Sequence, residues 1–294
     1  MTVERVSVHS DGPVSVLDHG GEGPLIVCVH GLEGSAYNWN LIAPHLVQSH
    51  RVVAPDLSGF GYTPPLKRGS TVDVNVEVVA DVIRHFGTDA LVIGNSMGGL
   101  ITALLADRHP DLVRATVLVD PAAPVSMWTR VRPSAAARLS TPLIPWAGEK
   151  LIDLYRSTQS AEDGVREAFE FVYADTAALD PSVWEAGLEI AHLRRTQPWA
   201  TNALVEAVQS IAPYVVRKSR FAKVLHRVSQ PTLLVHGTED RLIQPATARW
   251  IAQERPDWTT ALFEGVGHVP MVEAPDRFLE VFDAWESSIS ASAA

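Results

Sequence analysis

The chain has 294 residues but only one cysteine, Cys28, so no internal disulfide can form. Cys28 lies in the apolar run Leu25–Val29, where it is expected to act as a small buried hydrophobic side chain. The chain also lacks any apolar run near the roughly 18 residues that a membrane-spanning helix needs. Its N-terminus has no basic region followed by an apolar core, so no secretory signal is predicted. The expected location is therefore cytoplasmic.

Metal-binding motifs are absent as well, since neither His-x-x-Glu-His nor Cys-x-x-Cys occurs. No metal site is predicted on this ground. The net charge is −10, which disfavours nucleic acid as a partner. Hydrophobic residues make up 46% of the chain and charged residues 20%, a balance typical of a folded globular protein rather than a disordered one.

What the chain does contain is a regular alternation of short apolar runs and helical patterns. Runs such as Leu25-Ile26-Val27 suit strands buried on both faces, and the helices between them imply parallel connections. The first two strands are joined by Asp11-Gly12-Pro13 and are expected to form an antiparallel edge. Expected strands are Arg5–Val8, Val14–Asp18, Leu25–His30, Arg51–Ala54, Leu91–Ile93, Ala115–Val119, Thr232–His236 and Thr260–Phe263. Expected helices are Asn38–Val47, Val72–Phe86, Met97–Arg108, Ala246–Glu254 and Pro275–Ser288, with a frayed tail from Ser287 to Ala294.

The alternation stops after Asp120 and resumes at Pro231. The residues between show helical patterns interrupted by prolines and no convincing strand. Residues 122–228 hold 13 Lys/Arg and 11 Asp/Glu, although the whole chain holds 24 and 34, so the negative charge lies elsewhere. The sequence therefore predicts an α/β core domain of residues 1–121 and 230–294, with a helical insertion at 122–229.

The most informative motif is Gly94-Asn95-Ser96-Met97-Gly98, which fits the pattern Gly-x-Ser-x-Gly. An apolar run precedes it and a helix-forming run follows, so the chain turns sharply from a strand into a helix. Such a turn forces Ser96 into strained backbone angles and requires very small residues at Gly94 and Gly98. The helix N-terminus behind the serine favours developing negative charge. Ser96 is therefore predicted to be a catalytic nucleophile.

A serine hydroxyl needs a base to take its proton and a carboxylate to orient that base. In a parallel sheet both groups are expected on loops that follow the carboxyl ends of strands. The predicted base is His268, in a glycine-containing loop after the last strand. The predicted acid is Asp240, after the first strand that follows the insertion. Asp120, at the end of the preceding strand, stays open as an alternative acid.

Backbone N–H groups are needed to stabilise the oxyanion of such a reaction. One is expected from Met97, directly after the serine, and the other from Leu32 in the loop after an early strand. Gly31 permits a close approach of the backbone, and His30 is interpreted as a brace for this loop. A carboxylate beside an oxyanion would oppose it, so Glu33 is expected to face away.

Together these features resemble the α/β-hydrolase family over nearly the whole chain. The resemblance implies an α/β-hydrolase fold, with a mostly parallel eight-stranded sheet and the insertion as a helical cap. It also implies that Ser96, His268 and Asp240 form a triad that works through an acyl-enzyme, without metal or cofactor. The motifs that carry it are His30-Gly31, the loop Pro55–Gly61, the serine motif, Asp240, Gly267-His268 and the insertion.

The nucleophile is serine, whereas relatives that act on epoxides and haloalkanes use aspartate. Ser96 therefore predicts acyl transfer, namely hydrolysis of carboxylic esters with small or medium apolar acyl or aryl groups. Carbon–carbon bond hydrolysis is an alternative, because Gly94–Gly99 is similar to the hexapeptide of the meta-cleavage-product hydrolases. Leu32-Glu33 and Val269 depart from the usual pattern of those enzymes. A non-catalytic ligand-binding relative is a further alternative, although all three triad residues are present.

Aromatic residues of the insertion are expected to govern the choice of substrate. Those predicted to line the pocket are Trp128, Trp146 and Trp199, together with Val269 beside the histidine. The basic stretch Arg217–Arg227 is interpreted as a solvated helix face, with a guide for anionic substrates as the alternative. The expected partner is a small apolar ester, and the chain is expected to be a monomer or a homodimer.

Overall fold

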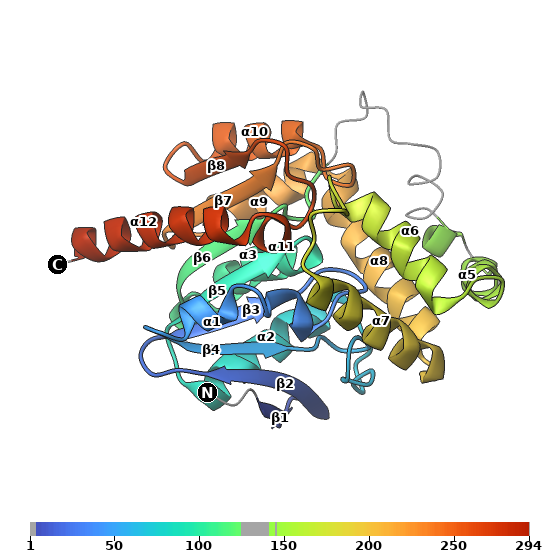
Figure 1. Ribbon diagram of the computed structural model, residues 1–294. Coiled ribbons are helices and arrows are strands. Elements are labelled where there is room, and N and C mark those ends of the chain that lie inside the picture. The colour runs from blue at the N-terminus through green and yellow to red at the C-terminus, as the bar shows by residue number, and fades with distance from the viewer. Residues whose placement is uncertain (1–3, 125–140, 145, 294) are drawn as a thin grey trace.

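Eight strands form one sheet in the computed structural model, which describes residues 4–124, 141–144 and 146–293 (Figure 1). The strands are β1 (Glu4–His9), β2 (Pro13–Gly20), β3 (Leu25–Val29), β4 (Arg51–Pro55), β5 (Ala90–Asn95), β6 (Val113–Val119), β7 (Thr232–Gly237) and β8 (Thr259–Phe263). Their order is β1-β2-β4-β3-β5-β6-β7-β8. β2 runs antiparallel to β1 and β4, and the other neighbours are parallel. All eight predicted strands and the antiparallel edge are therefore confirmed.

Alternate residues of the parallel strands point to opposite faces and build two apolar layers. Val27 belongs to the layer that contains α2 (Val72–Phe86) and α3 (Met97–Arg108). Cys28 belongs to the layer on the other face, which contains α12 (Pro275–Ala293). Helices thus cover both faces of the sheet, and Cys28 is buried as predicted. The other helices around the sheet are η1 (Ala36–Trp39), α1 (Ala43–Leu46), η2 (Pro110–Leu112), α10 (Pro245–Glu254) and α11 (Pro270–Glu273).

Two of the predicted helices need correction. The helix predicted over residues 38–47 is divided into η1 and α1, because Pro44 falls in the first turn of α1. There its missing N–H costs no helical hydrogen bond, whereas inside a longer helix it would break one. The tail predicted to fray from Ser287 stays helical up to Ala293. Ile289 in this tail packs against the same apolar layer as Phe282, which explains the extension.

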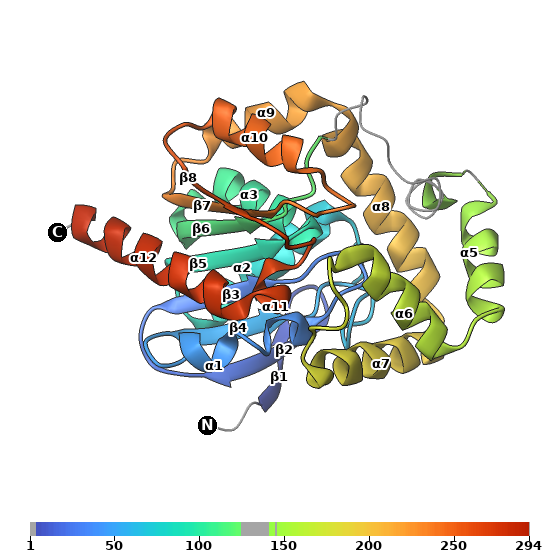
Figure 2. The same ribbon diagram turned by 45° about the horizontal axis from the view of Figure 1, so that its top comes forward.

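The described residues between β6 and β7 form helices. They are η3 (Thr141–Leu143), α5 (Gly148–Ser157), α6 (Ala161–Val172), α7 (Pro181–Thr196), α8 (Ala200–Val216) and α9 (Lys218–Arg227). α5, α6, α7 and α8 gather on one side of the sheet in both views (Figure 1, Figure 2). α9 packs on α3 and α10, and Phe221 and Leu225 of α9 are fully buried in that layer. By its packing α9 belongs with the core, and the division at residue 229 stays a prediction.

Candidate active site

Ser96 occupies the sharp turn between β5 and α3. Its backbone has φ 56° and ψ −116°, a region that residues other than glycine rarely adopt. Two backbone hydrogen bonds hold the turn: Ser96 N donates to Val119 O at 2.9 Å, and Ser96 O accepts from Ala122 N at 2.8 Å. The strained turn expected from the sequence is thus present, and the end of β6 supports it.

The two glycines of the motif allow this turn to pack. A Cβ atom at Gly94 would lie 2.2 Å from Gly98 O, and one at Gly98 would lie 2.1 Å from Val29 O. Both distances are far below van der Waals contact, and both obstacles are backbone atoms that have no room to move. Only glycine therefore lets α3 begin this close to β3 and β5. The position of the serine side chain at the end of the sheet depends on that packing.

Asp240 and His268 meet in the loops that follow β7 and β8. His268 Nδ1 donates to Asp240 Oδ2 at 2.6 Å, and both side chains are buried. The second oxygen, Asp240 Oδ1, accepts the N–H groups of Leu242 at 2.7 Å and Ile243 at 3.0 Å. Burial alone would raise the pKa of Asp240, but the charge and hydrogen bond of His268 outweigh it and hold the pKa below its usual value. An ionised carboxylate therefore orients the imidazole, as a catalytic triad requires.

Asn95 connects the serine turn to the histidine loop. Its side-chain Nδ2 donates to His268 O at 3.0 Å and to Val119 O at 3.2 Å. In the sequence Asn95 stands out only as part of the hexapeptide Gly94–Gly99, and that pattern does not predict this contact. The contact brings the loop of the predicted base to the residue that precedes the predicted nucleophile.

The loop that contains Leu32 passes over the serine. A Cβ atom at Gly31 would lie 3.0 Å from Ser96 Cβ, which shows how closely the two backbones approach. His30 Nδ1 donates to Gly31 O at 2.7 Å, and its Nε2 accepts a backbone N–H from the loop after β4 at 3.0 Å. Burial lowers the pKa of His30, so the ring is neutral. Because both ring nitrogens bind backbone, His30 braces this loop.

Glu33 follows in the same loop at φ 58° and binds two arginines of the insertion. Arg156 Nη2 donates to Glu33 Oε1 at 2.7 Å, and Arg194 Nη1 donates to the same oxygen at 3.3 Å. Arg194 Nη2 also donates to the backbone oxygen of Glu33 at 2.5 Å. The arginines explain how a carboxylate is tolerated in this loop, and they tie α5 and α7 to it.

Asp120, the alternative acid, is fully buried beside Asp240. Asp120 Oδ1 accepts Gly237 N at 3.0 Å and lies 3.4 Å from His236 Nε2. His236 donates through Nε2 to Ile243 O at 2.8 Å, and burial keeps it neutral by lowering its pKa. In the structure it is therefore Asp240 that accepts the hydrogen bond from His268. Asp120 binds Gly237 N instead.

Glu273, which was not among the residues predicted for the site, fastens the histidine loop to the insertion. Its carboxylate accepts Gly267 N at 2.9 Å and Ala174 N at 2.8 Å. His268 N donates in turn to Val172 O, at the end of α6, at 2.8 Å. Burial raises the pKa of Glu273 despite these bonds. No motif surrounds Glu273 in the sequence, and its distant partners give no local signal.

The predicted pocket residues lie in different surroundings. Trp128 lies outside the described residues. Trp146 is 97% exposed, so its position gives no support to a pocket-lining role. Trp199 is half-buried at the start of α8, and Val269 is buried directly after the histidine. Of the four, only Val269 is adjacent in sequence to a predicted triad residue.

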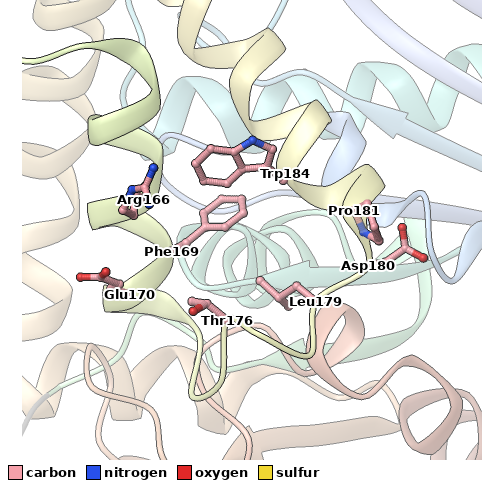
Figure 3. Close-up of a pocket in the computed structure, with 8 residues that line it drawn as sticks. All are labelled: Arg166, Phe169, Glu170, Thr176, Leu179, Asp180, Pro181 and Trp184. Carbon is pink, nitrogen blue, oxygen red and sulfur yellow. The ribbon is translucent and has the colours of Figure 1, made fainter.

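A cavity of about 270 Å³ lies between α6 and α7 (Figure 3). The rings of Phe169 and Trp184 meet edge to face in it, at 5.7 Å between centroids, and the cavity is lined by Arg166, Phe169, Glu170, Thr176, Leu179, Asp180, Pro181 and Trp184. These residues all belong to the insertion. Phe169 also packs against the apolar layer that contains α12, so it joins the insertion to that face of the sheet.

In the described parts of the chain, no helix combines the length and the apolar character that crossing a bilayer requires.

Comparison with known proteins identifies the family to which the chain belongs. A family model described as "Alpha/beta hydrolase family" matches residues 26–281. The pimeloyl-[acyl-carrier protein] methyl ester esterase of Nitrosospira multiformis is 28% identical, over 88% of this chain and 93% of its own. The 2-hydroxymuconate semialdehyde hydrolase of Pseudomonas sp. strain CF600 is also 28% identical, over 94% and 92%. A solved bacterial membrane phospholipase A is 25% identical, with a TM-score of 0.78 and coverage of 98% and 87%. The chain therefore belongs to the alpha/beta hydrolase family.

Proposed function

We propose that the chain is a serine hydrolase that cleaves carboxylic esters, with Ser96 as nucleophile, His268 as base and Asp240 as acid. The observation that carries the proposal is the 2.6 Å bond from His268 to Asp240, in a loop that Asn95 ties to the strained serine turn. Esterases and a phospholipase among the similar proteins support ester hydrolysis as the reaction class.

In this mechanism Ser96 Oγ attacks the ester carbonyl carbon while His268 Nε2 takes the hydroxyl proton. Asp240 stabilises the imidazolium that forms. The carbonyl oxygen becomes an oxyanion, and the N–H groups of Met97 and Leu32 are proposed to stabilise it. His268 then gives its proton to the departing alcohol. Water, activated by the same imidazole, finally releases the acid from Ser96.

We assign the helical insertion as a cap that selects a neutral, apolar substrate. The two arginines that reach the loop of Leu32 are engaged by Glu33, which removes an obvious anchor for an anionic substrate. Val269, buried directly after the base, is proposed to present an apolar surface to the acyl or aryl group. The proposed substrate class is therefore small or medium apolar esters.

Carbon–carbon bond hydrolysis is the second candidate, and two observations favour it. The hexapeptide Gly94–Gly99 is similar to that of the meta-cleavage-product hydrolases, and a 2-hydroxymuconate semialdehyde hydrolase is 28% identical over 94% of this chain. Against it stands the engagement of Arg156 and Arg194 by Glu33, because a dienoic diketo acid is anionic. Turnover of such an acid, with esters inert, would reverse the ranking.

The test combines labelling with kinetics. A fluorophosphonate should add one label per chain, mapped to Ser96 by mass spectrometry, and a p-nitrophenyl ester series should show which acyl chain length is hydrolysed fastest. Ser96→Ala should lower kcat by several orders of magnitude and abolish labelling. The matched control is Ser288→Ala on α12, which extends away from the insertion (Figure 1) and should retain both properties.

Two results would overturn the assignment. Near-normal turnover by Ser96→Ala would exclude it as nucleophile. A folded wild-type protein that neither takes the label nor hydrolyses any ester would favour a ligand-binding role. The cytoplasmic location, the monomeric or dimeric state and the absence of a nucleic-acid partner stay predictions.

A further inference from the structure

A second buried carboxyl group stands beside the triad acid. Asp120 is fully buried at the end of β6, and its backbone has φ 43°, which is unusual for a residue other than glycine. Polar atoms of Asp120, His236 and Asp240 all lie within 4.8 Å of one another. A strained residue persists only where its surroundings hold it in place, and such residues concentrate at functional sites. Asp120 therefore needs an explanation beyond its place in a turn.

The N–H donors around the two carboxyl groups are unequally shared. Asp240 accepts three, from His268, Leu242 and Ile243. Asp120 Oδ1 accepts one, from Gly237, and in the described structure its Oδ2 is buried and receives none. The neighbouring His236 directs its Nε2 hydrogen to a backbone oxygen at 2.8 Å. The protein thus supplies the hydrogen-bond donors that an ionised Asp240 needs, but it does not supply those that an ionised Asp120 would need.

An oxygen of the Asp120 carboxyl group nevertheless lies within 4.8 Å of an oxygen of the Asp240 carboxyl group. Two buried carboxylates this close would repel each other, and a single proton on one of them removes the repulsion and permits a hydrogen bond between them. Burial, together with the charge of Asp240, raises the pKa of Asp120 well above its usual value, while the pKa of Asp240 is lowered. These directions favour a proton on Asp120, and its Oδ2 is the buried oxygen that receives no other hydrogen bond.

We propose that Asp120 is a positioning residue of the triad, whose protonated Oδ2 donates a hydrogen bond to the Asp240 carboxylate and fixes it against His268. The catalytic consequence rests on the proposed ester hydrolysis. The proton stays on Asp120 throughout the cycle, so the pair carries one negative charge whether His268 is neutral or protonated. That single charge remains available to stabilise the imidazolium of His268. If Asp240 rotated away from His268, it would lose the hydrogen bond that Asp120 donates.

The first test measures the proton itself. The infrared spectrum of wild-type protein at pH 7 should contain the carbonyl band of a buried protonated carboxylic acid, which shifts in D₂O. The band should be missing from Asp120→Asn, and its presence there unchanged would overturn the proposal. This measurement needs no substrate, so it remains decisive even if ester hydrolysis fails.

The second test compares variants in kcat/KM for the best ester. Asp120→Asn keeps an N–H donor for Asp240 and an acceptor for Gly237 N, so we expect a loss within about tenfold. Asp120→Ala lacks both the donor and the acceptor, so its kcat/KM should be at least tenfold lower than that of Asp120→Asn. Asp240→Asn should lose about 10³- to 10⁴-fold, as expected when the orienting carboxylate is removed. Thermal unfolding of each variant shows which losses come from misfolding.

Two outcomes would show that the role of Asp120 does not depend on a proton. If Asp120→Asn lost as much activity as Asp240→Asn, Asp120 would act as an ionised acid. If EDTA removed activity and a divalent cation restored it, a cation would occupy the cluster instead. Ester turnover without the infrared band would refute the role of Asp120 and leave the proposed function intact.

Discussion

The side-chain amide of Asn95 donates to the backbone oxygen of His268 at 3.0 Å, across 173 positions of sequence. The same amide donates to Val119 O at 3.2 Å, so one side chain joins the serine turn, the end of β6 and the histidine loop. The net contribution of a typical hydrogen bond to stability is about 1 kcal/mol. Its effect on catalysis is expected to be larger, because a misplacement of about 1 Å can lower a rate about 10²-fold.

Replacing Asn95 with Ala should therefore reduce activity more than stability. We expect kcat/KM for the best ester to fall about 10- to 100-fold. The free energy of unfolding should fall by about 1–3 kcal/mol, because two buried carbonyl groups lose a donor. Ester kinetics and urea unfolding measure the two effects separately.

The matched control is Gln230→Ala. Gln230 is also a buried amide, and its Nε2 donates to Pro110 O at 3.3 Å next to the N-terminal end of β7, opposite the loops that contain Asp240 and His268. It should lose comparable stability while kcat/KM stays within about threefold of wild type. Equal losses of activity in both variants would show that Asn95 acts only through stability.

Glu33 should suppress the binding of anionic substrates. Glu33→Gln removes the carboxylate that engages Arg156 and Arg194, so the positive charge beside the loop that contains Leu32 increases. A charge pair near 4 Å in water is worth on the order of 1 kcal/mol, which corresponds to about fivefold in kcat/KM. We expect the ratio of kcat/KM for a carboxylate-bearing ester to that for a neutral ester to rise by about this factor, and the rise to shrink with added salt.

Glu189→Gln is the control for that experiment. Glu189 lies on the same helix as Arg194, but it accepts the hydroxyl groups of Tyr37 and Tyr62. Its removal should leave the substrate ratio unchanged. A ratio that stays constant in Glu33→Gln as well would place the two arginines out of reach of the substrate.

Gly98 should tolerate no side chain. The Cβ atom of Gly98→Ala would lie 2.1 Å from Val29 O, so α3 or β3 would have to shift. Overpacking of this kind costs about 1–3 kcal/mol or more, and here it also displaces Ser96.

The control is Gly164→Ala on α6. There the nearest obstacle is the flexible end of Gln159 at 3.8 Å, so stability should stay equal or rise by about 0.5–1 kcal/mol. Thermal unfolding of the two variants tests the contrast, and equal Tm values would contradict it.

The sequence predicted the features that local physics determines. Continuous apolar runs predicted the strands, because a strand buried on both faces must be apolar at every position. The glycines around Ser96 predicted the strained turn, because each one is required by a contact within the motif or with the adjacent strand. Pro44 is a local signal too, because a proline in the first turn of α1 divides the helix predicted over residues 38–47.

Contacts between distant segments were not predictable in the same way. Glu33 was expected to face away from the oxyanion, but nothing near it in the sequence indicated Arg156 or Arg194 as partners. Glu273 lies in no motif, although it holds the histidine loop. Trp146 looked suitable for a pocket by residue type, yet type does not tell which way a side chain faces, and it is 97% exposed.

His19 should make the fold sensitive to acid. It is buried on β2, its Nε2 has no hydrogen-bond partner in the described structure, and burial lowers its pKa to about 4 against a smaller opposing effect of Asp18. The unfolded chain binds the proton from about pH 6.5, whereas the native state resists it until about pH 4. The contribution of His19 is thus fully present above pH 6.5 and is lost as the pH falls towards 4.

The variant His19→Gln removes this titration while keeping a polar side chain in the strand. At about 1.4 kcal/mol per pKa unit, wild type should lose about 3 kcal/mol more unfolding free energy than the variant between pH 7 and pH 4. Urea unfolding of both proteins across this range measures the difference. If the unfolding free energies of the two proteins fell in parallel as the pH is lowered, water would reach the His19 ring in the native state. The acid sensitivity would then have to come from another group. A steeper loss in wild type, confined to this window, would assign it to the buried imidazole.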